Sequence, residues 1–176
     1  MASEHDKIEI VEADITTLAV DAIVNAANDR LRPGGGVCGA IHRAAGPELA
    51  RACAAIGACP TGAARITKGF GLPAKYVIHA VGPVWKGGGA NEVELLASCY
   101  RESLRLAAGE SLASIAFPAI STGIYGFPAP SAAGIAVRAV ADSLRRYPVI
   151  ERVIFCCFGK ESAALHRQAL AGIAKS

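Results

Sequence analysis

Short runs of apolar residues alternate along the chain with longer segments in which apolar positions recur at helical spacing. The short runs predict strands over residues 8–12, 22–26, 65–67, 76–81, 114–118 and 152–156. The longer segments predict helices over residues 38–45, 47–56, 91–108, 131–147 and 161–174. Several strands are rich in Val and Ile and poor in charge, as strands buried on both faces are. The alternation therefore predicts an α/β fold with helices covering both faces of a sheet.

Punctuating residues support these boundaries. Pro47 suits the first turn of a restarted helix, Asn91 suits an N-cap, and Pro148 suits a helix stop. Clusters of Gly and Pro predict loops within one domain over residues 33–36, 69–73, 82–89 and 126–130.

Composition narrows the class of protein. With 176 residues, 52% of them apolar and 19% charged, the chain fits one domain spanning residues 1–176. No apolar run approaches the roughly 20 residues of a membrane span, and the charged start lacks the apolar core of a signal peptide. Because no Cys or His spacing resembles a zinc site, we expect reduced thiols in a cytoplasmic protein, with no metal and no cofactor. The absence of heptads predicts a monomer. The cysteines are Cys38, Cys53, Cys59, Cys99, Cys156 and Cys157.

The charge distribution favours an anionic ligand. The net charge is only +3, but no acidic residue stands between Glu48 and Glu92. Five basic residues fall in that gap: Arg51, Arg65, Lys68, Lys75 and Lys86. Nucleic acid is an unlikely partner because aromatic residues are not interleaved with these basic ones.

A first glycine-rich loop follows the strand at 22–26. Residues 34–36 are three successive glycines directly before a predicted helix, which suits a phosphate because free N–H groups meet the anion there. Gly34, Gly36 and Gly39 also match the dinucleotide fingerprint GxGxxG. That interpretation fails on context, because a long loop intervenes and no acidic residue follows at the spacing of a ribose carboxylate.

A second loop follows the strand at 114–118. It offers consecutive backbone donors, two hydroxyls and one aromatic ring, from Ser121, Thr122, Gly123, Ile124, Tyr125 and Gly126. Either loop alone is as consistent with an ordinary tight turn. Together they predict two anion sites side by side at the carboxyl edge of a parallel sheet, an arrangement that suits a diphosphate.

Several polar residues allow two interpretations each. Asp14 either caps a turn through Thr16 or Thr17, or accepts a hydrogen bond from an exocyclic amine such as that of adenine. Asn25 and Asn28 either serve the backbone of a turn, or hold a ribose hydroxyl or a water.

The candidate proton carriers and nucleophiles are few. His42 is equally a packed surface histidine or a proton carrier, and His5, His79 and His166 suggest no group of cooperating residues. Cys38 stands at a helix start, but no base lies beside it in sequence. A small residue lining the pocket is therefore favoured over a nucleophile. The other cysteines are expected in the core.

Four segments in this order resemble the macrodomain family, specifically its MacroD-like branch. They read ADIT at 13–16, VDAIVNAAN at 20–28, GGGVCGAIHRAAG at 34–46 and PAISTGIYGFP at 118–128. The resemblance extends from about residue 8 to about residue 170. It implies a three-layer α/β/α sandwich around a mixed six-stranded sheet that binds ADP-ribose in a cleft.

The resemblance also implies roles for residues. Asp14 would take the adenine amine, with the Ile15 N–H and Phe158 near the base. The loops would grip the diphosphate through Gly35, Gly36, Val37 and residues 121–125. Asn25 and Asn28 would face the distal ribose, against which Tyr125 packs, while Cys38 and His42 complete the catalytic set.

Members of this branch hydrolyse mono-ADP-ribose from acidic side chains of proteins and deacetylate O-acetyl-ADP-ribose, without a metal. The resemblance therefore implies a hydrolase in which a ligand phosphate helps to deprotonate a water. The sequence departs from the pattern in having Cys38 where many members have Asp, Ala13 for the usual Gly, and Gly159 where Asp is frequent. The first departure leaves a non-catalytic ADP-ribose reader as the alternative.

Overall fold

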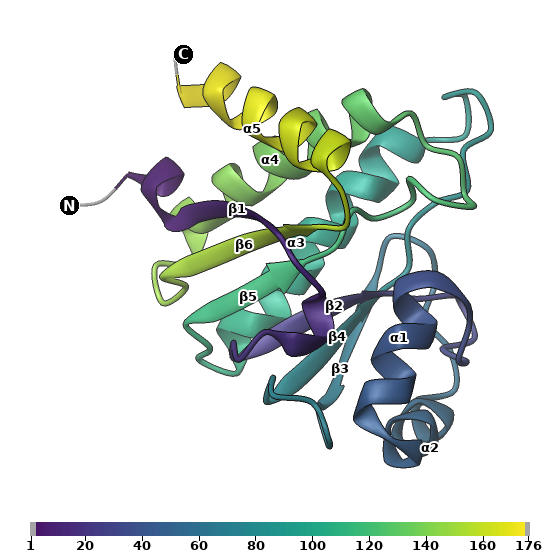
Figure 1. Ribbon diagram of the computed structural model, residues 1–176. Coiled ribbons are helices and arrows are strands. Elements are labelled where there is room, and N and C mark those ends of the chain that lie inside the picture. The colour runs from purple at the N-terminus through teal and green to yellow at the C-terminus, as the bar shows by residue number, and fades with distance from the viewer. Residues whose placement is uncertain (1–2, 175–176) are drawn as a thin grey trace.

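Within the described residues, 3–174, the computed structural model contains a six-stranded sheet of order β1-β6-β5-β2-β4-β3 (Figure 1). The ends of the predicted domain, residues 1–2 and 175–176, lie outside the described residues. The strands are β1 Ile8–Glu12, β2 Ala22–Ala26, β3 Ala64–Lys68, β4 Tyr76–Ala80, β5 Ser114–Phe117 and β6 Arg152–Cys157. The α-helices are α1 Gly36–Ala45, α2 Pro47–Ile56, α3 Glu92–Gly109, α4 Ala129–Arg146 and α5 Lys160–Ala174. Short 3-10 helices, η1 Glu4–Lys7 and η2 Ile15–Thr17, precede and follow β1.

The sheet is mixed, as expected. Every neighbouring pair is parallel except β3 and β4, which are antiparallel. The strands β1, β6, β5, β2 and β4 therefore end at the same edge of the sheet. This shared edge receives the loops that the sequence singled out.

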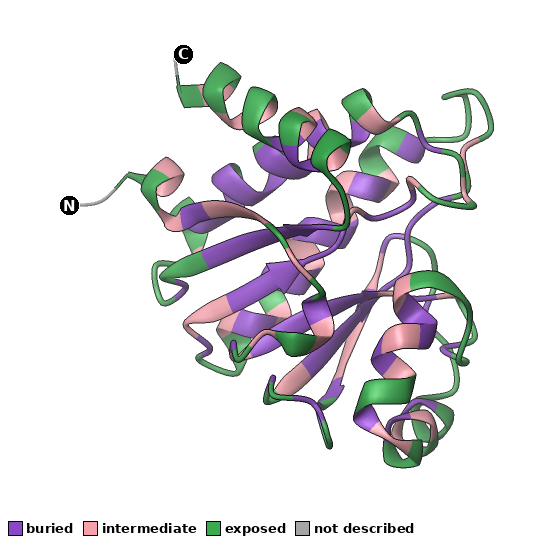
Figure 2. Cartoon of the chain, in the orientation of Figure 1, coloured by how far each residue is buried: buried purple, intermediate pink, exposed green. Residues whose placement is uncertain are grey.

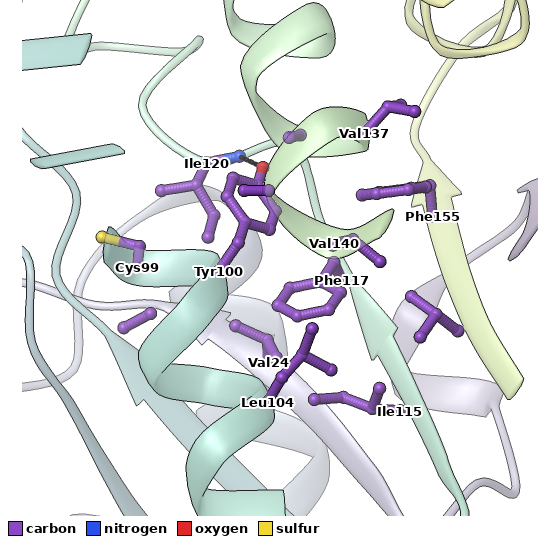
Figure 3. Close-up of a cluster of buried hydrophobic side chains, with 14 of the residues drawn as sticks. Val24, Cys99, Tyr100, Leu104, Ile115, Phe117, Ile120, Val137, Val140 and Phe155 are labelled. Carbon is purple, nitrogen blue, oxygen red and sulfur yellow. Dashed lines mark hydrogen bonds between the residues drawn. The ribbon is translucent and has the colours of Figure 1, made fainter. Parts of the chain in front are cut away.

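Helices cover both faces of the sheet, which confirms the three-layer α/β/α architecture (Figure 1). One face packs against α1 and α2 in a cluster that includes Ile23, Ile41 and Leu49. The other face packs against α3, α4 and α5 in a larger cluster, in which the rings of Tyr100, Phe117 and Phe155 lie next to one another (Figure 3). Figure 2 shows that burial is concentrated on the strands and on the inward faces of the helices.

The predicted boundaries agree closely with these elements. α2 begins with Pro47 at its first position, and α4 ends two residues before Pro148. Asn91 occupies the N-cap position of α3 as predicted, but its backbone is left-handed at φ 64° and its side chain makes no capping hydrogen bond. None of the helices within residues 3–174 is long and apolar enough to cross a membrane.

Candidate functional site

Four loops meet at the carboxyl edge of the parallel strands. They follow β1, β6, β5 and β2, which are consecutive neighbours in the sheet. β2 and β5 pair directly, with Ala22 opposite Ile115, so the two glycine-rich loops leave the sheet side by side. The expectation that these loops are neighbours is confirmed, and ligands of open α/β sheets bind at this kind of edge.

The first glycine loop runs directly into the N-terminus of α1. Gly35 occupies the N-cap, and Gly36 has φ 58°, a left-handed conformation that favours glycine. A Cβ on Gly39 would lie 2.5 Å from the carbonyl oxygen of Gly34, so glycine lets the loop fold back onto the helix. The first N–H groups of α1 have no partner within the helix. Together with the helix dipole they give this end of α1 the properties of an anion site.

Asn28 fixes the shape of this loop. Its Nδ2 donates to the carbonyl oxygen of Arg32 at 2.8 Å, and its Oδ1 accepts from the Arg32 N–H at 3.0 Å. Cys38, the third residue of α1, is buried, and its thiol also donates to the Arg32 carbonyl at 3.8 Å. Asn28 and Cys38 are thus brought together around one backbone carbonyl.

The second loop is a tight turn held at both ends. The Gly126 N–H donates to the Gly123 carbonyl and the Phe127 N–H donates to the Ser121 carbonyl, each at 3.0 Å. Ser121 is buried with a left-handed φ of 67°, while Ile124 is almost fully exposed at the tip. The Trp85 N–H donates to the Tyr125 carbonyl at 2.8 Å, which joins this loop to the one after β4.

The third group lies at the ends of β1 and β6. Asp14 Oδ1 accepts from the N–H of Thr16 at 3.0 Å and from its hydroxyl at 2.7 Å, so the capping interpretation of this residue is confirmed. Both bonds lower the pKa of Asp14, the one from the Thr16 hydroxyl more than the one from its N–H, and they keep the carboxylate charged. Ile15 is buried, while Phe158 is fully exposed beyond β6. Asp14 is exposed, so its second oxygen is available to a ligand.

Asn25 lies deeper than the other candidates. It is 1% exposed on the face of β2 that packs against α1, directly opposite His79 of β4. Its Nδ2 lies 3.1 Å from His79 Nδ1, and His79 Nε2 lies 3.0 Å from Thr67 Oγ1. The expectation that His79 belongs to no group of polar residues is therefore wrong. The sequence signal for this group was the presence of Asn25 and His79 as polar residues within strands that are otherwise mostly apolar.

His42 stands on α1, half-buried. Its Nδ1 is buried without a hydrogen-bond partner, and burial lowers its pKa, so the imidazole is neutral near pH 7. It lines a cavity of about 430 Å³ with Gly34, Gly39 and Arg43. His42 therefore lies near the glycine loop as a neutral imidazole, and its role as a proton carrier stays a prediction.

The cysteines expected in the core are buried, and the six within the described residues are free thiols. Burial raises the pKa of Cys53 to about 11 and, on the larger core face, that of Cys99 to about 12. These thiols stay protonated at neutral pH and are poor nucleophiles. No group of three His, Cys, Asp or Glu within residues 3–174 is arranged to hold a metal ion.

The basic residues of the acid-free stretch form no single cluster at this edge, although Lys86 lies there, in the loop after β4. Lys75 precedes β4, at the end of the strand opposite the glycine loops, and pairs with Asp21 at 3.5 Å. Arg65 and Lys68 lie on β3, the outermost strand. An anion at the glycine loops would therefore be held by backbone N–H groups and helix dipoles rather than by a cluster of cations.

Glu92 organises the loop after β4, a role that the sequence did not reveal. Its carboxylate accepts from the N–H groups of Lys86 at 2.8 Å, Gly88 at 2.9 Å and Ala90 at 2.5 Å. This loop carries Trp85, whose N–H holds Tyr125. One acidic side chain therefore supports the segment that contacts the second glycine loop.

Stability is expected to depend on Glu92 in acid. The backbone bonds, that of Lys86 first, lower the pKa of Glu92 from its ordinary 4.5 to about 2. A lowered pKa stabilises the folded state above about pH 4.5, and this contribution is lost as the pH falls towards 2. Chemical denaturation at pH 7, 4 and 3 should show wild type losing more stability than Glu92→Gln, which is destabilised already at pH 7. The exposed Glu161→Gln is the control, and equal losses in wild type and Glu92→Gln would contradict this account.

The geometry places the chain in a class of α/β proteins that have glycine-rich loops at the carboxyl ends of neighbouring parallel strands. The model of the Macro domain family matches residues 24–136. The chain belongs to the macrodomain family.

Several relatives cover almost the whole chain. A macro domain-containing protein of Chlorobaculum tepidum is 58% identical over 164 residues, which are 93% of this chain and 95% of that protein. The O-acetyl-ADP-ribose deacetylase of Escherichia coli K12 is 54% identical over 168 residues, with 93% and 95% covered.

Solved structures of other macrodomains have the same fold as this chain. The Oceanobacillus iheyensis macrodomain with ADP has a TM-score of 0.90 at 41% identity, covering 96% of this chain and 92% of its own. The Trypanosoma brucei macrodomain in complex with ADP-ribose has a TM-score of 0.88 at 42% identity, covering 93% and 69%.

Proposed function

We propose that the chain binds ADP-ribose and hydrolyses acyl esters of its distal ribose. The substrates are O-acetyl-ADP-ribose and proteins mono-ADP-ribosylated on acidic side chains. The observation that carries this proposal is the pair of glycine loops on neighbouring strands, with Asn28 and Cys38 at the base of the first. Relatives named O-acetyl-ADP-ribose deacetylase at 54–57% identity, and macrodomain structures with ADP or ADP-ribose, support it.

The loops divide the ligand between them. The N-terminus of α1 and the turn at 121–126 present backbone N–H groups to the diphosphate from two sides. Asp14 and Ile15, with Phe158, stand two and one strands away from β5, at a distance that suits the adenine end. Asn28 and Tyr125 then face the distal ribose.

The chemistry needs no group beyond the chain and its substrate. Water adds to the acyl carbonyl, and a diphosphate oxygen of the ligand, or neutral His42, takes the water's proton. The ester C–O bond breaks, and the ribose oxygen leaves with a proton as a free hydroxyl. N–H groups of the loops stabilise the negative charge that develops, as preorganised donors do in other acyl transfers.

Incubation with O-acetyl-ADP-ribose and with a glutamate-linked mono-ADP-ribosylated protein tests the proposal. Release of ADP-ribose from both is expected, and full retention of both substrates rules it out. Release from O-acetyl-ADP-ribose alone would exclude only the protein substrate.

Substitutions of Cys38 test whether its thiol takes part in the proposed hydrolysis. We expect Cys38→Ala to keep the rate within about threefold, because a thiol hydrogen bond is weak. Cys38→Asp should raise kcat by about tenfold or more, since a carboxylate positions and activates water better. Stopped assays with thermal melts check both, and a loss of more than tenfold in a folded Cys38→Ala would show that the thiol takes part in the chemistry.

The second candidate function, a non-catalytic ADP-ribose reader, is favoured by one observation. Cys38 is buried, and it stands at the position where the family resemblance implies an Asp in many members. A reader would bind ADP-ribose in a calorimeter and release none from either ester. Appreciable turnover by the wild type excludes it.

A further inference from the structure

A chain of buried hydrogen bonds runs behind the first glycine loop, and two of its residues, His79 and Thr67, have no part in the proposed chemistry. His79 is its centre: the residue is fully buried, with Asn25 Nδ2 at 3.1 Å from Nδ1 and Thr67 Oγ1 at 3.0 Å from Nε2. Thr67, on the edge strand β3, also donates its hydroxyl to the carbonyl oxygen of Lys68 at 3.1 Å. The Cys53 thiol also lies 3.6 Å from Nε2, so the buried imidazole is surrounded by polar groups, which calls for an explanation other than packing.

The directions of these bonds follow from the donors available. Because Thr67 Oγ1 donates its single proton to the Lys68 carbonyl, we assign the His79 tautomer with Nε2–H, which donates to Thr67 Oγ1 and lies 3.6 Å from Cys53 Sγ. Nδ1 of the neutral ring is then the acceptor, and Asn25 donates to it. Burial, followed by the charge of His42, lowers the pKa of His79 to about 4, so the ring is neutral at pH 7.

The chain continues from Asn25 to the loop. The second proton of Asn25 Nδ2 points to Cys38 Sγ at 3.7 Å, and Cys38 donates to the Arg32 carbonyl that Asn28 also holds. Two acceptors therefore face Nδ2, and a flipped amide would present an oxygen to both. Asn25 Oδ1 is left buried without a partner.

An unpartnered buried acceptor costs stability and is retained where a ligand or water completes it. Asn25 is the second-last residue of β2 and lies near the edge of the sheet that carries the glycine loop. Its free oxygen suits an O–H donor such as a ribose hydroxyl. The atom has that role only while the amide keeps its orientation.

We infer that His79, backed by Thr67, is a positioning residue that holds the Asn25 amide with Oδ1 turned to an O–H donor of the bound ligand. This inference rests on the proposed function. His79 touches no substrate itself, and its effect passes through Asn25.

Two variants of similar size separate this role from packing. In His79→Asn the side-chain oxygen occupies the position of Nδ1 and can accept from Asn25, whereas His79→Leu offers no acceptor. We expect His79→Leu to lower kcat about 100-fold, with KM for O-acetyl-ADP-ribose changed little, and His79→Asn to recover about tenfold of that loss. Both variants should melt at similar, lowered temperatures. If kcat follows the melting temperature instead of the acceptor, the role is structural and the inference is wrong.

A second pair of variants changes Thr67, which is remote from the glycine loops. Thr67→Val removes the hydroxyl at nearly constant shape, and Thr67→Ser keeps it. Thr67→Val should lower kcat about tenfold, the kinetic equivalent of one neutral hydrogen bond, while Thr67→Ser stays close to wild type. Equal rates in the two folded variants would overturn the inference.

Nitrogen-15 NMR of the histidine rings tests the hydrogen bonds without any turnover. The wild type should show a neutral His79 protonated on Nε2, with Nδ1 as acceptor, and Thr67→Val should shift the Nε2 resonance. A ring protonated on Nδ1 overturns the inference even in an active enzyme. If the wild type proves inactive, the proposed function fails while the ring spectrum still decides the orientation of the amide, so the two failures are distinguishable.

Discussion

Replacing Asn28 with alanine is expected to lower kcat for O-acetyl-ADP-ribose about 100-fold, the scale of losing one preorganised polar group from an acyl-transfer site. The same change removes both bonds to the Arg32 backbone, at 2.8 and 3.0 Å, that shape the glycine loop. Affinity for ADP-ribose should therefore fall as well, because the free N–H groups of α1 lose their fixed geometry.

Two further variants complete the Asn28 experiment. Asn28→Asp keeps an acceptor for the Arg32 N–H but turns a carboxylate oxygen towards the Arg32 carbonyl, so an intermediate loss is expected. Asp142→Ala, exposed on α4, is the control and should behave as wild type. Rates come from single-substrate assays and affinities from calorimetry. If Asn28→Ala retains the wild-type rate, the assignment of the ribose end is wrong.

The second large effect is expected at Gly82, which is buried in the loop after β4. A Cβ there would lie 2.2 Å from Ser121 Oγ and 2.6 Å from Ile120 Cγ2. Because real Cβ atoms do not come so close, Gly82→Ala must push the start of the second glycine loop away from the sheet. We expect ADP-ribose affinity to fall about tenfold or more, and the melting temperature by roughly 3 to 10 °C.

A matched glycine and a compensating change control this prediction. Gly134→Ala on α4 makes the same substitution into open space, and should raise stability slightly without changing affinity. Adding Ser121→Gly to Gly82→Ala removes the clashing hydroxyl and suits the φ of 67°, so part of the affinity should return. Wild-type affinity in a folded Gly82→Ala would show that the loop's position does not matter for binding.

The elements of the fold were predictable because their patterns are local. The apolar runs marked every strand to within about a residue or two, and Gly36 and Ser121 fell in loops whose glycines and polar residues announced them. That the two glycine-rich loops lie side by side could also be predicted, since the carboxyl ends of parallel strands share one edge of the sheet. The roles given to Asn25, Asn28, Cys38 and His42 stay predictions.

The contacts that hold the site were not predictable, because they depend on strand register. Asn25 and His79 are 54 residues apart and meet only because β2 and β4 pair in one particular register. Glu92 looked like an ordinary first-turn acid, and its three backbone partners depend on a loop fold that no local pattern specifies. Asn91 lies at the predicted N-cap position, but the local pattern did not indicate that its side chain would make no capping bond.

The two faces of the sheet divide the chain's tasks. The large aromatic cluster lies under α3, α4 and α5, while the hydrogen-bonded residues behind the first glycine loop lie on the face covered by α1 and α2. Effects of substitutions that share no partners add nearly independently. Tyr100 links the two tasks, since its hydroxyl oxygen accepts from the Ile120 N–H at 3.5 Å, next to Ser121 (Figure 3). Away from Tyr100 and from the Glu92-held loop that contacts the second glycine loop, sequence drift and engineered stabilisation can accumulate on the aromatic face of such a domain while selection on its chemistry acts on the other.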